Sequence, residues 1–141
     1  MVEIVTAQHP ALLAWAAERL DIPFDPSRCR WLAGVEGARI VWVVVYSDFA
    51  RRGCQLSIFT DGTRTWPTRR VLNAIFSTVF LQWQLHRCTF LVRADNIASL
   101  QLVRRLGAQQ EGVLREASEG SVDMIVFGML YSEAAKWLRQ Q

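Results

Sequence analysis

The chain has 141 residues, of which 51% are hydrophobic and 21% are charged. This length suits one domain, and the composition favours a packed core over disorder. The net charge of +3 is too modest to mark a nucleic-acid binder. Arginines nevertheless gather at residues 51–52, 64–70 and 104–105, which makes an anionic ligand plausible; a solvated basic face is the alternative.

The sequence predicts a cytoplasmic protein with no membrane partner. Its longest apolar run, residues 40–46, is far shorter than the roughly 20 residues that a membrane-spanning helix needs. The first eight residues lack the basic and apolar regions of a signal peptide. Cys29, Cys54 and Cys88 are odd in number and form no CxxC pair, so we expect reduced thiols and no metal site.

The first half of the chain predicts one helix followed by an antiparallel sheet. Apolar residues recur at helical spacing over residues 10–20, and the pattern stops before two prolines. Residues 30–35 and 39–46 are rich in β-branched and aromatic residues, and Glu36-Gly37 between them predicts a hairpin turn. Residues 55–60 predict a third strand.

An amphipathic helix of about four turns is predicted next. Its apolar face consists of Leu72, Ile75, Phe76, Val79, Phe80 and Trp83. Pro67 and Thr68 occupy the positions expected for a first-turn proline and an N-cap hydroxyl. Residues 89–93 then predict a short strand. A strand, a helix and a further strand in this order imply a crossover connection and therefore a parallel pair.

The last third of the chain predicts a second helix, two strands and a final helix. The second helix covers residues 96–106, with Asn96 as its N-cap and Gly107 at its C-terminal end. Two strands, residues 109–115 and 122–130, flank the turn Glu119-Gly120, and Ser132 is predicted to cap the final helix. The whole chain, residues 1–141, is thus predicted to be one α/β domain. It has a mixed, mostly antiparallel sheet of six to seven strands, a central parallel pair, and helices on both faces.

Three motifs resemble the ribosomal-protein N-terminal acetyltransferase branch of the GNAT N-acetyltransferases. The branch has N-x-x-S, then K/R-x-G-F six residues later, then E-G-x-x-R. Here residues 96–99 are NIAS, residues 105–108 are RLGA and residues 111–115 are EGVLR. The chain is also similar to short GNAT-like proteins of tailed phages. The resemblance implies an acyltransferase of GNAT fold that transfers an acetyl group from acetyl-coenzyme A to a small-molecule or protein amine.

The resemblance places the pyrophosphate of acetyl-coenzyme A at the start of the central helix. Family members have Q/R-x-x-G-x-G/A there, whereas residues 64–69 of this chain are RTWPTR. The first arginine is kept, but proline and arginine replace the small residues, and proline removes an N–H donor. We therefore expect the cofactor to be bound by Arg64, Thr68, Arg69 and Arg70 together with the helix N-terminus. Asn96 is expected to cap its helix and to contact cofactor or acceptor.

The resemblance implies one catalytic residue. Ser99 matches the serine of N-x-x-S, which lies near the coenzyme sulfur in that branch; a hydroxyl bonded only to the helix backbone is the alternative. Many family members protonate the leaving thiolate with a tyrosine, but the corresponding position here is the apolar Val103. For the general base, the sequence leaves Asp48, Glu111, Asp123 and a chain of water molecules open.

A second hypothesis is a catalytically degenerate module that keeps the fold and binds a protein or nucleic acid through its basic face. The missing glycines, tyrosine and base favour this hypothesis, whereas the N-x-x-S motif and the arginine-rich helix start favour the enzyme. The acceptor is not specified by the sequence. A homodimer also stays open.

Overall fold

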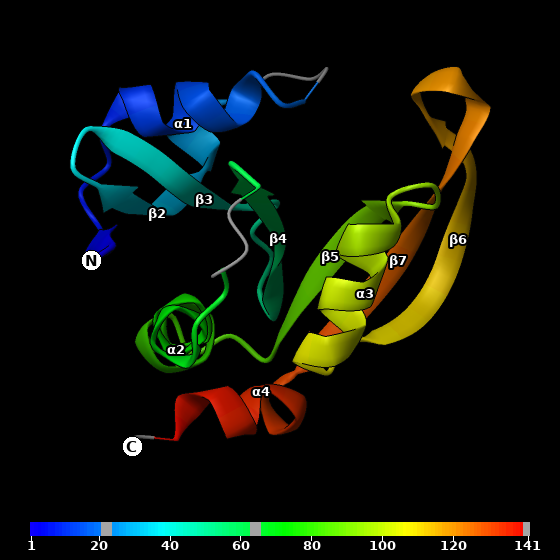
Figure 1. Ribbon diagram of the computed structural model, residues 1–141. Coiled ribbons are helices and arrows are strands. Elements are labelled where there is room, and N and C mark those ends of the chain that lie inside the picture. Colours follow the sequence, from blue (N-terminus) through cyan, green and yellow to red (C-terminus); the bar gives the residue numbers. More distant parts are fainter. Residues whose placement is uncertain (21–23, 63–65, 140–141) are drawn as a thin grey trace.

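The computed structural model describes residues 1–20, 24–62 and 66–139. In these residues, seven strands form one sheet in the order β1-β2-β3-β4-β5-β7-β6. The strands are β1 Glu3–Val5, β2 Arg30–Glu36, β3 Arg39–Ser47, β4 Gly53–Thr60, β5 Arg87–Arg93, β6 Gln109–Ser118 and β7 Val122–Leu130. The helices are α1 Pro10–Ala17, α2 Arg69–Ser77, α3 Ile97–Leu106 and α4 Tyr131–Leu138. The predicted mixed sheet with helices on both faces is confirmed (Figure 1).

The parallel pair β4–β5 sits in the middle of the sheet, and every other neighbouring pair is antiparallel. Only three residue pairs join the two strands, the last being Gln55 with Thr89. Beyond that pair β4 continues to Thr60 and β5 to Arg93, and the two strands diverge (Figure 1). We call the space between residues 56–60 and residues 90–93 the β4–β5 opening.

Two hydrophobic cores cover the two faces of the sheet. On β3, Trp42, Val44 and Tyr46 belong to the core beneath α2, α3 and α4. The alternate residues Val43 and Val45 belong to the smaller core beneath α1. Because successive side chains of a strand point to opposite faces, a strand covered on both sides must be apolar throughout. This requirement accounts for the unbroken apolar run in β3.

Three sequence-based details were wrong at the ends of helices. Thr68 does cap α2, because its Oγ1 accepts a hydrogen bond from the backbone N–H of Val71 (3.3 Å), so Pro67 precedes the cap and is not in the first turn. The α-helix also ends early, and a π-helical turn follows over Thr78–Gln82. The Thr78 hydroxyl donates to the Ala74 carbonyl (2.9 Å), which also accepts the backbone N–H of Thr78.

The final helix begins one residue before the predicted cap. Leu130 occupies the N-cap position of α4, and its backbone N–H donates to Glu133 Oε1 (2.8 Å). Ser132 therefore lies inside the first turn. Strand β1, which pairs with the end of β2, was not predicted because three residues are too few to show a periodic pattern. None of the helices in the described ranges is long and apolar enough to cross a membrane.

Candidate active site

The β4–β5 opening is the feature of this sheet that can receive an extended ligand. Parallel strands place their carboxyl ends at the same edge, and ligands of open α/β sheets bind outside those ends. Here the strand pairing stops at Gln55 and Thr89, several residues before either strand ends. Backbone N–H and C=O groups that face the opening thus lack the strand partner that they have elsewhere in the sheet.

A helix N-terminus follows each of the two diverging strands. At the start of α3, Asn96 Oδ1 accepts a hydrogen bond from the backbone N–H of Ser99 (3.2 Å), so Asn96 is the predicted N-cap. Thr68 has the same function for α2. Each cap satisfies one of the orphan amides, and the amides of the first two helical residues remain available. Together with the helix dipole, these amides favour negative charge.

The side chains of Arg69 and Arg70 hold other parts of the chain against the start of α2. The Arg69 guanidinium donates to the backbone carbonyl of Lys136 and lies 5.5 Å from the centre of the Trp137 ring, so it ties the end of α4 to α2. Arg70 Nη1 donates to the backbone carbonyl of Val2 (3.2 Å). A guanidinium carries five N–H groups, so both residues retain donors that can bind a phosphate.

Ser99 lies half-buried in the first turn of α3. Its backbone N–H is bound by Asn96, but within the described residues its hydroxyl has no hydrogen-bond partner and is free to donate. Three of the predicted cofactor contacts, Thr68, Arg69 and Arg70, thus meet at the start of α2, and Asn96 lies beside Ser99 at the start of α3. Arg64 falls outside the described residues.

Neither tyrosine of the chain replaces the one that many family members use. Val103 is buried in the core, as expected for an apolar residue at that position. Tyr46 is also buried, and its hydroxyl donates to the carbonyl of Ile75 (2.9 Å). Burial raises the pKa of Tyr46, which makes it a poor proton donor. Tyr131 directly follows Leu130, which pairs with Arg87 at the start of β5, so it lies at the end of the strand away from the opening.

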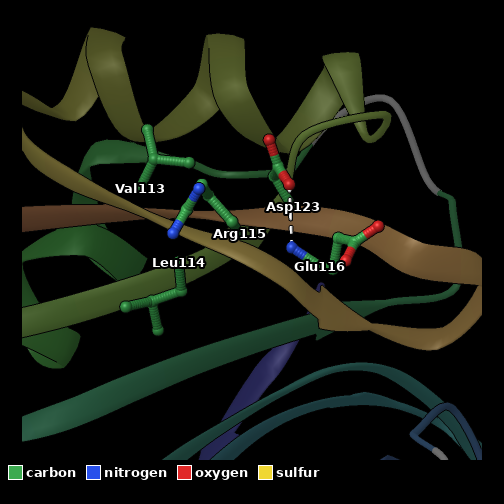
Figure 2. A pocket seen from close by; sticks show the side chains of 5 residues that line it. All are labelled: Val113, Leu114, Arg115, Glu116 and Asp123. Carbon is green, nitrogen blue, oxygen red and sulfur yellow. Dashed lines mark hydrogen bonds between the residues drawn. The ribbon is translucent and has the colours of Figure 1, made fainter.

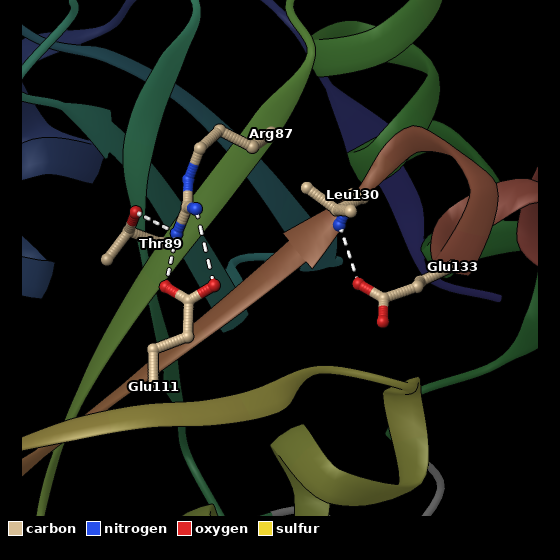
Figure 3. A network of polar contacts seen from close by, with 5 residues as sticks. All are labelled: Arg87, Thr89, Glu111, Leu130 and Glu133. Atoms are coloured by element: carbon tan, nitrogen blue, oxygen red, sulfur yellow. Dashed lines mark hydrogen bonds and ion pairs between the residues drawn. The ribbon is translucent and has the colours of Figure 1, made fainter.

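Of the candidate bases, Glu111 forms an ion pair with Arg87. Arg87 Nη2 lies 2.6 Å from Glu111 Oε1, and Nη1 lies 3.3 Å from Oε2 (Figure 3). Arg87 Nη2 also donates to the hydroxyl of Thr89 (3.3 Å). The hydrogen bond with Glu111 raises the pKa of Arg87. The pair crosses above Gly128, where even a Cβ atom would collide with both side chains. Each carboxylate oxygen of Glu111 therefore accepts a hydrogen bond from Arg87.

The other two carboxylates have different surroundings. Asp123 Oδ1 accepts a hydrogen bond from the backbone N–H of Glu116 (2.8 Å) beside an open hollow of about 640 Å³ (Figure 2). Val113 and Leu114, which also line the hollow, are consecutive on β6 and point to opposite faces, so the hollow wraps around the edge of the sheet. Asp48 lies in the turn after β3, at the opposite end of the central strands from the opening.

Arg93, the last residue of β5, has a role that no motif in the sequence predicted. Its guanidinium forms a paired contact with Asp95 (both 3.0 Å) and donates to Ser118 Oγ (2.8 Å) and to the Glu119 carbonyl (3.1 Å). The hydrogen bond from Arg93 lowers the pKa of Asp95. Arg93 thereby fixes the β6–β7 turn next to the start of α3. The closely spaced opposite charges in Arg93-Ala94-Asp95 were the available signal.

Comparison with known proteins supports this architecture through structure alone. A scan against protein-family models finds no match, and a search of curated proteins also finds none. Among solved structures, variant forms of the spermidine/spermine N-acetyltransferase SpeG from Vibrio cholerae superpose with a TM-score of 0.78 at 13% identity, covering 96% of this chain and 98% of that chain. The ribosomal-protein-S5-alanine acetyltransferase from Vibrio fischeri gives a TM-score of 0.66 at 19% identity, covering 74% of this chain and 62% of that chain.

The opened parallel pair and these superpositions show that the chain has the GNAT acetyltransferase fold, as the motifs predicted. Within that fold, its solved neighbours include one enzyme named for spermidine and spermine and another named for a ribosomal protein.

Proposed function

We propose that the protein is an N-acetyltransferase that transfers the acetyl group of acetyl-coenzyme A to an amine. The observation that carries this proposal is the β4–β5 opening, which has a capped helix N-terminus after each of its two strands. Free backbone groups and positive helix ends are the complement of a ligand that has both amide groups and phosphates. The proposal includes one domain over residues 1–141 and a cytoplasmic location, where the three free cysteines would stay reduced.

The residues present fit acetyl-coenzyme A at two places. The amide-containing arm of the coenzyme matches the free strand edges of residues 56–60 and 90–93. Its pyrophosphate matches the start of α2, where Arg69 and Arg70 are exposed beside free amides and replace donors that glycines provide in the family. Arg64 and Thr68 are proposed as further contacts, and Asn96 as a contact on the α3 side.

Acetyl-coenzyme A supplies an acetyl group activated as a thioester. Backbone N–H groups along the opening are suited to stabilise the negative charge that develops on the carbonyl oxygen. We propose that the free hydroxyl of Ser99 donates its proton to the departing sulfur and regains a proton from solvent. The amine must lose a proton before it attacks. Because both oxygens of Glu111 already accept hydrogen bonds from Arg87, we assign that proton to solvent and not to Glu111.

A non-catalytic module is the second candidate, and one observation favours it. Arg69 and Arg70, which would replace the missing glycine amides, already donate to the carbonyls of Lys136 and Val2. If these bonds use the guanidinium groups fully, the start of α2 has only a structural role. The two candidates differ in whether the chain binds acetyl-coenzyme A and releases its thiol.

The direct test measures thiol release from acetyl-coenzyme A with a panel of amines: polyamines, peptides with free N-termini, and aromatic amines. Mass spectrometry of the acceptor should show one added acetyl group. Changing Arg69 and Arg70 to alanine should weaken coenzyme binding at least tenfold, because charge-assisted hydrogen bonds contribute about 1.5–3 kcal/mol each before solvent screening. Dephospho-coenzyme A should lose as much, since the proposed contact is to the pyrophosphate.

The matched control is Arg51→Ala with Arg52→Ala. It removes the same charge from the β3–β4 turn, at the opposite end of these strands, and should leave coenzyme binding unchanged. Equal binding by the Arg69/Arg70 variant and the parent would refute the pyrophosphate site. Acetyl-coenzyme A that binds without any acetylated product would instead favour the non-catalytic module.

A further inference from the structure

A pocket of about 310 Å³ lies at the end of the central strands that is opposite to the β4–β5 opening. It is lined by Ser27, Arg28, Arg30, Phe49 and Trp83. Three segments far apart in the sequence bring these residues together: the turn before β2, the turn after β3, and the end of the π-helical turn before β5. The mechanism proposed above uses none of them. We call this site the arginine–aromatic pocket.

The pocket presents aromatic rings that the fold leaves partly uncovered. Phe49 is 45% exposed, and its ring centre lies 5.3 Å from that of Trp83, with the two rings nearly perpendicular. Trp83 is in turn anchored on the buried Tyr46, 4.9 Å between ring centres. An aromatic ring that is held rigidly at one edge and open on another side is suited to stack on a planar group.

The pocket also presents two arginines that form no ion pair among the described residues. Within the described residues, the side chain of Arg28 makes no hydrogen bond or ion pair, and Arg30 donates only to the neighbouring carbonyl of Cys29 (2.8 Å). Of the nearby acids, Asp25 is bound by the hydroxyl of Ser27 (2.7 Å), and that hydrogen bond lowers the pKa of Asp25. Asp48 is the other acid, in the turn before Phe49, and forms no ion pair with either arginine in the described part of the chain.

The positive surface continues beyond the pocket. Arg51 and Arg52 follow Phe49 in the same turn, and both side chains are exposed without a hydrogen bond or ion pair in the residues that the structure describes. The backbone carbonyl of Arg52 accepts from the N–H of His86 (2.8 Å), which fixes this turn against the segment that carries Trp83. Two arginines therefore line the pocket, and two more lie in the turn that carries Phe49.

We propose that the arginine–aromatic pocket binds single-stranded nucleic acid. One base would stack on the exposed ring of Phe49 with Trp83 beside it, and its phosphate would be bound by Arg28 and Arg30. Guanidinium groups bind phosphate in a bidentate manner, and stacking on aromatic rings is how proteins hold unpaired bases. Arg51 and Arg52 extend the phosphate contacts to neighbouring nucleotides, which favours a strand over a free nucleotide. Because this pocket and the β4–β5 opening lie at opposite ends of the central strands, the inference does not depend on acetyl transfer.

The test is fluorescence anisotropy of the full chain with a labelled oligodeoxythymidine and the matching oligouridine of about 12 nucleotides, a length within the range that one single-strand-binding domain covers. The parent should bind both at low salt, and binding should weaken as salt is added. In Arg28→Ala with Arg30→Ala, the slope of log affinity against log salt should fall by about 0.7, because the two arginines bind one phosphate and each phosphate contact on a single strand contributes about 0.7.

Phe49→Ala should weaken binding about tenfold to hundredfold while leaving the salt slope unchanged, because it removes a stacking contact and no charge. Phe49→Leu, which keeps the apolar packing against Trp83 but lacks a ring, should lose nearly as much and shows that the loss is not a folding defect. The matched control, Arg105→Ala with Arg115→Ala, removes two exposed arginines elsewhere and should bind like the parent.

The proposal is overturned if the parent binds no oligonucleotide at low salt, or if the control variant loses as much affinity as the pocket variant. The first result would show a solvated basic surface, and the second would show attraction by net charge alone. Competition by thymidine monophosphate as strong as that by the oligonucleotide would also overturn it, since the pocket would then accept a single nucleotide.

Discussion

Breaking the ion pair between Arg87 and Glu111 decides whether this carboxylate is structural or catalytic. The two side chains meet at 2.6 and 3.3 Å, with 34% of the Arg87 side chain and 40% of the Glu111 side chain exposed. Pairs at this exposure contribute about 0.2–1 kcal/mol, and a two-point contact belongs near the upper end. We therefore expect a coupling free energy of about 1 kcal/mol.

The assay is a double-mutant cycle with Arg87→Gln, Glu111→Gln and the double variant, followed by thermal unfolding. The unfolding entropy of a chain of this length is about 0.3 kcal/mol/K, so the coupling corresponds to a Tm difference of about 3 °C. High salt should reduce it. If the amine proton goes to solvent, Glu111→Gln should keep kcat within a few-fold of the parent. A loss of 100-fold or more would identify Glu111 as a general base and refute this reasoning.

Three further predictions follow from the site and the core. Ser99→Ala should lower kcat about 100-fold with little change in the Kd for acetyl-coenzyme A, since a proton donor to the leaving sulfur acts in the transition state; equal kcat values would return Ser99 to a structural role. Gly34→Ala should lower stability by about 1–3 kcal/mol, or about 3–10 °C in Tm, because its Cβ would collide with the buried indole of Trp42. Gly112→Ala is the control, as no atom lies within 4 Å of its Cβ, and a similar loss there would refute the packing argument. Burial raises the pKa of Cys54 from 9.0 to about 12. Above pH 9 the unfolded thiol ionises while the folded thiol does not, so urea-unfolding stability should fall as pH rises and fall less steeply in Cys54→Ala.

The sequence predicted the parts of the fold that local patterns determine. Three features were recognisable because each depends on neighbours within a few residues. They are the continuous apolar run of β3, the amphipathic face of α2, and the caps Thr68 and Asn96. The parallel pairing of β4 with β5 followed from the order of elements. The π-helical turn was not predictable, since its wider backbone bond, from the N–H of Trp83 to the carbonyl of Thr78, follows an apolar pattern that also suits an α-helix.

The site was less predictable because its contacts connect residues far apart in the chain. The sequence placed Arg69 and Arg70 at the start of α2 but could not show that Lys136 and Val2 supply carbonyls to them. Nor could it show that Glu111 is occupied by Arg87, a pair that needs the open space above Gly128. Such contacts are created by strand register and helix packing, which no local motif encodes.

Hydrogen exchange with and without acetyl-coenzyme A tests the central claim most directly. If the coenzyme lies in the β4–β5 opening, it should slow exchange of the amides in residues 56–60 and 90–93 and at the starts of α2 and α3. The paired amides of β2 and β3 should be unaffected. Protection confined to other parts of the chain, or no protection at saturating acetyl-coenzyme A, would contradict the assignment of the opening as the active site.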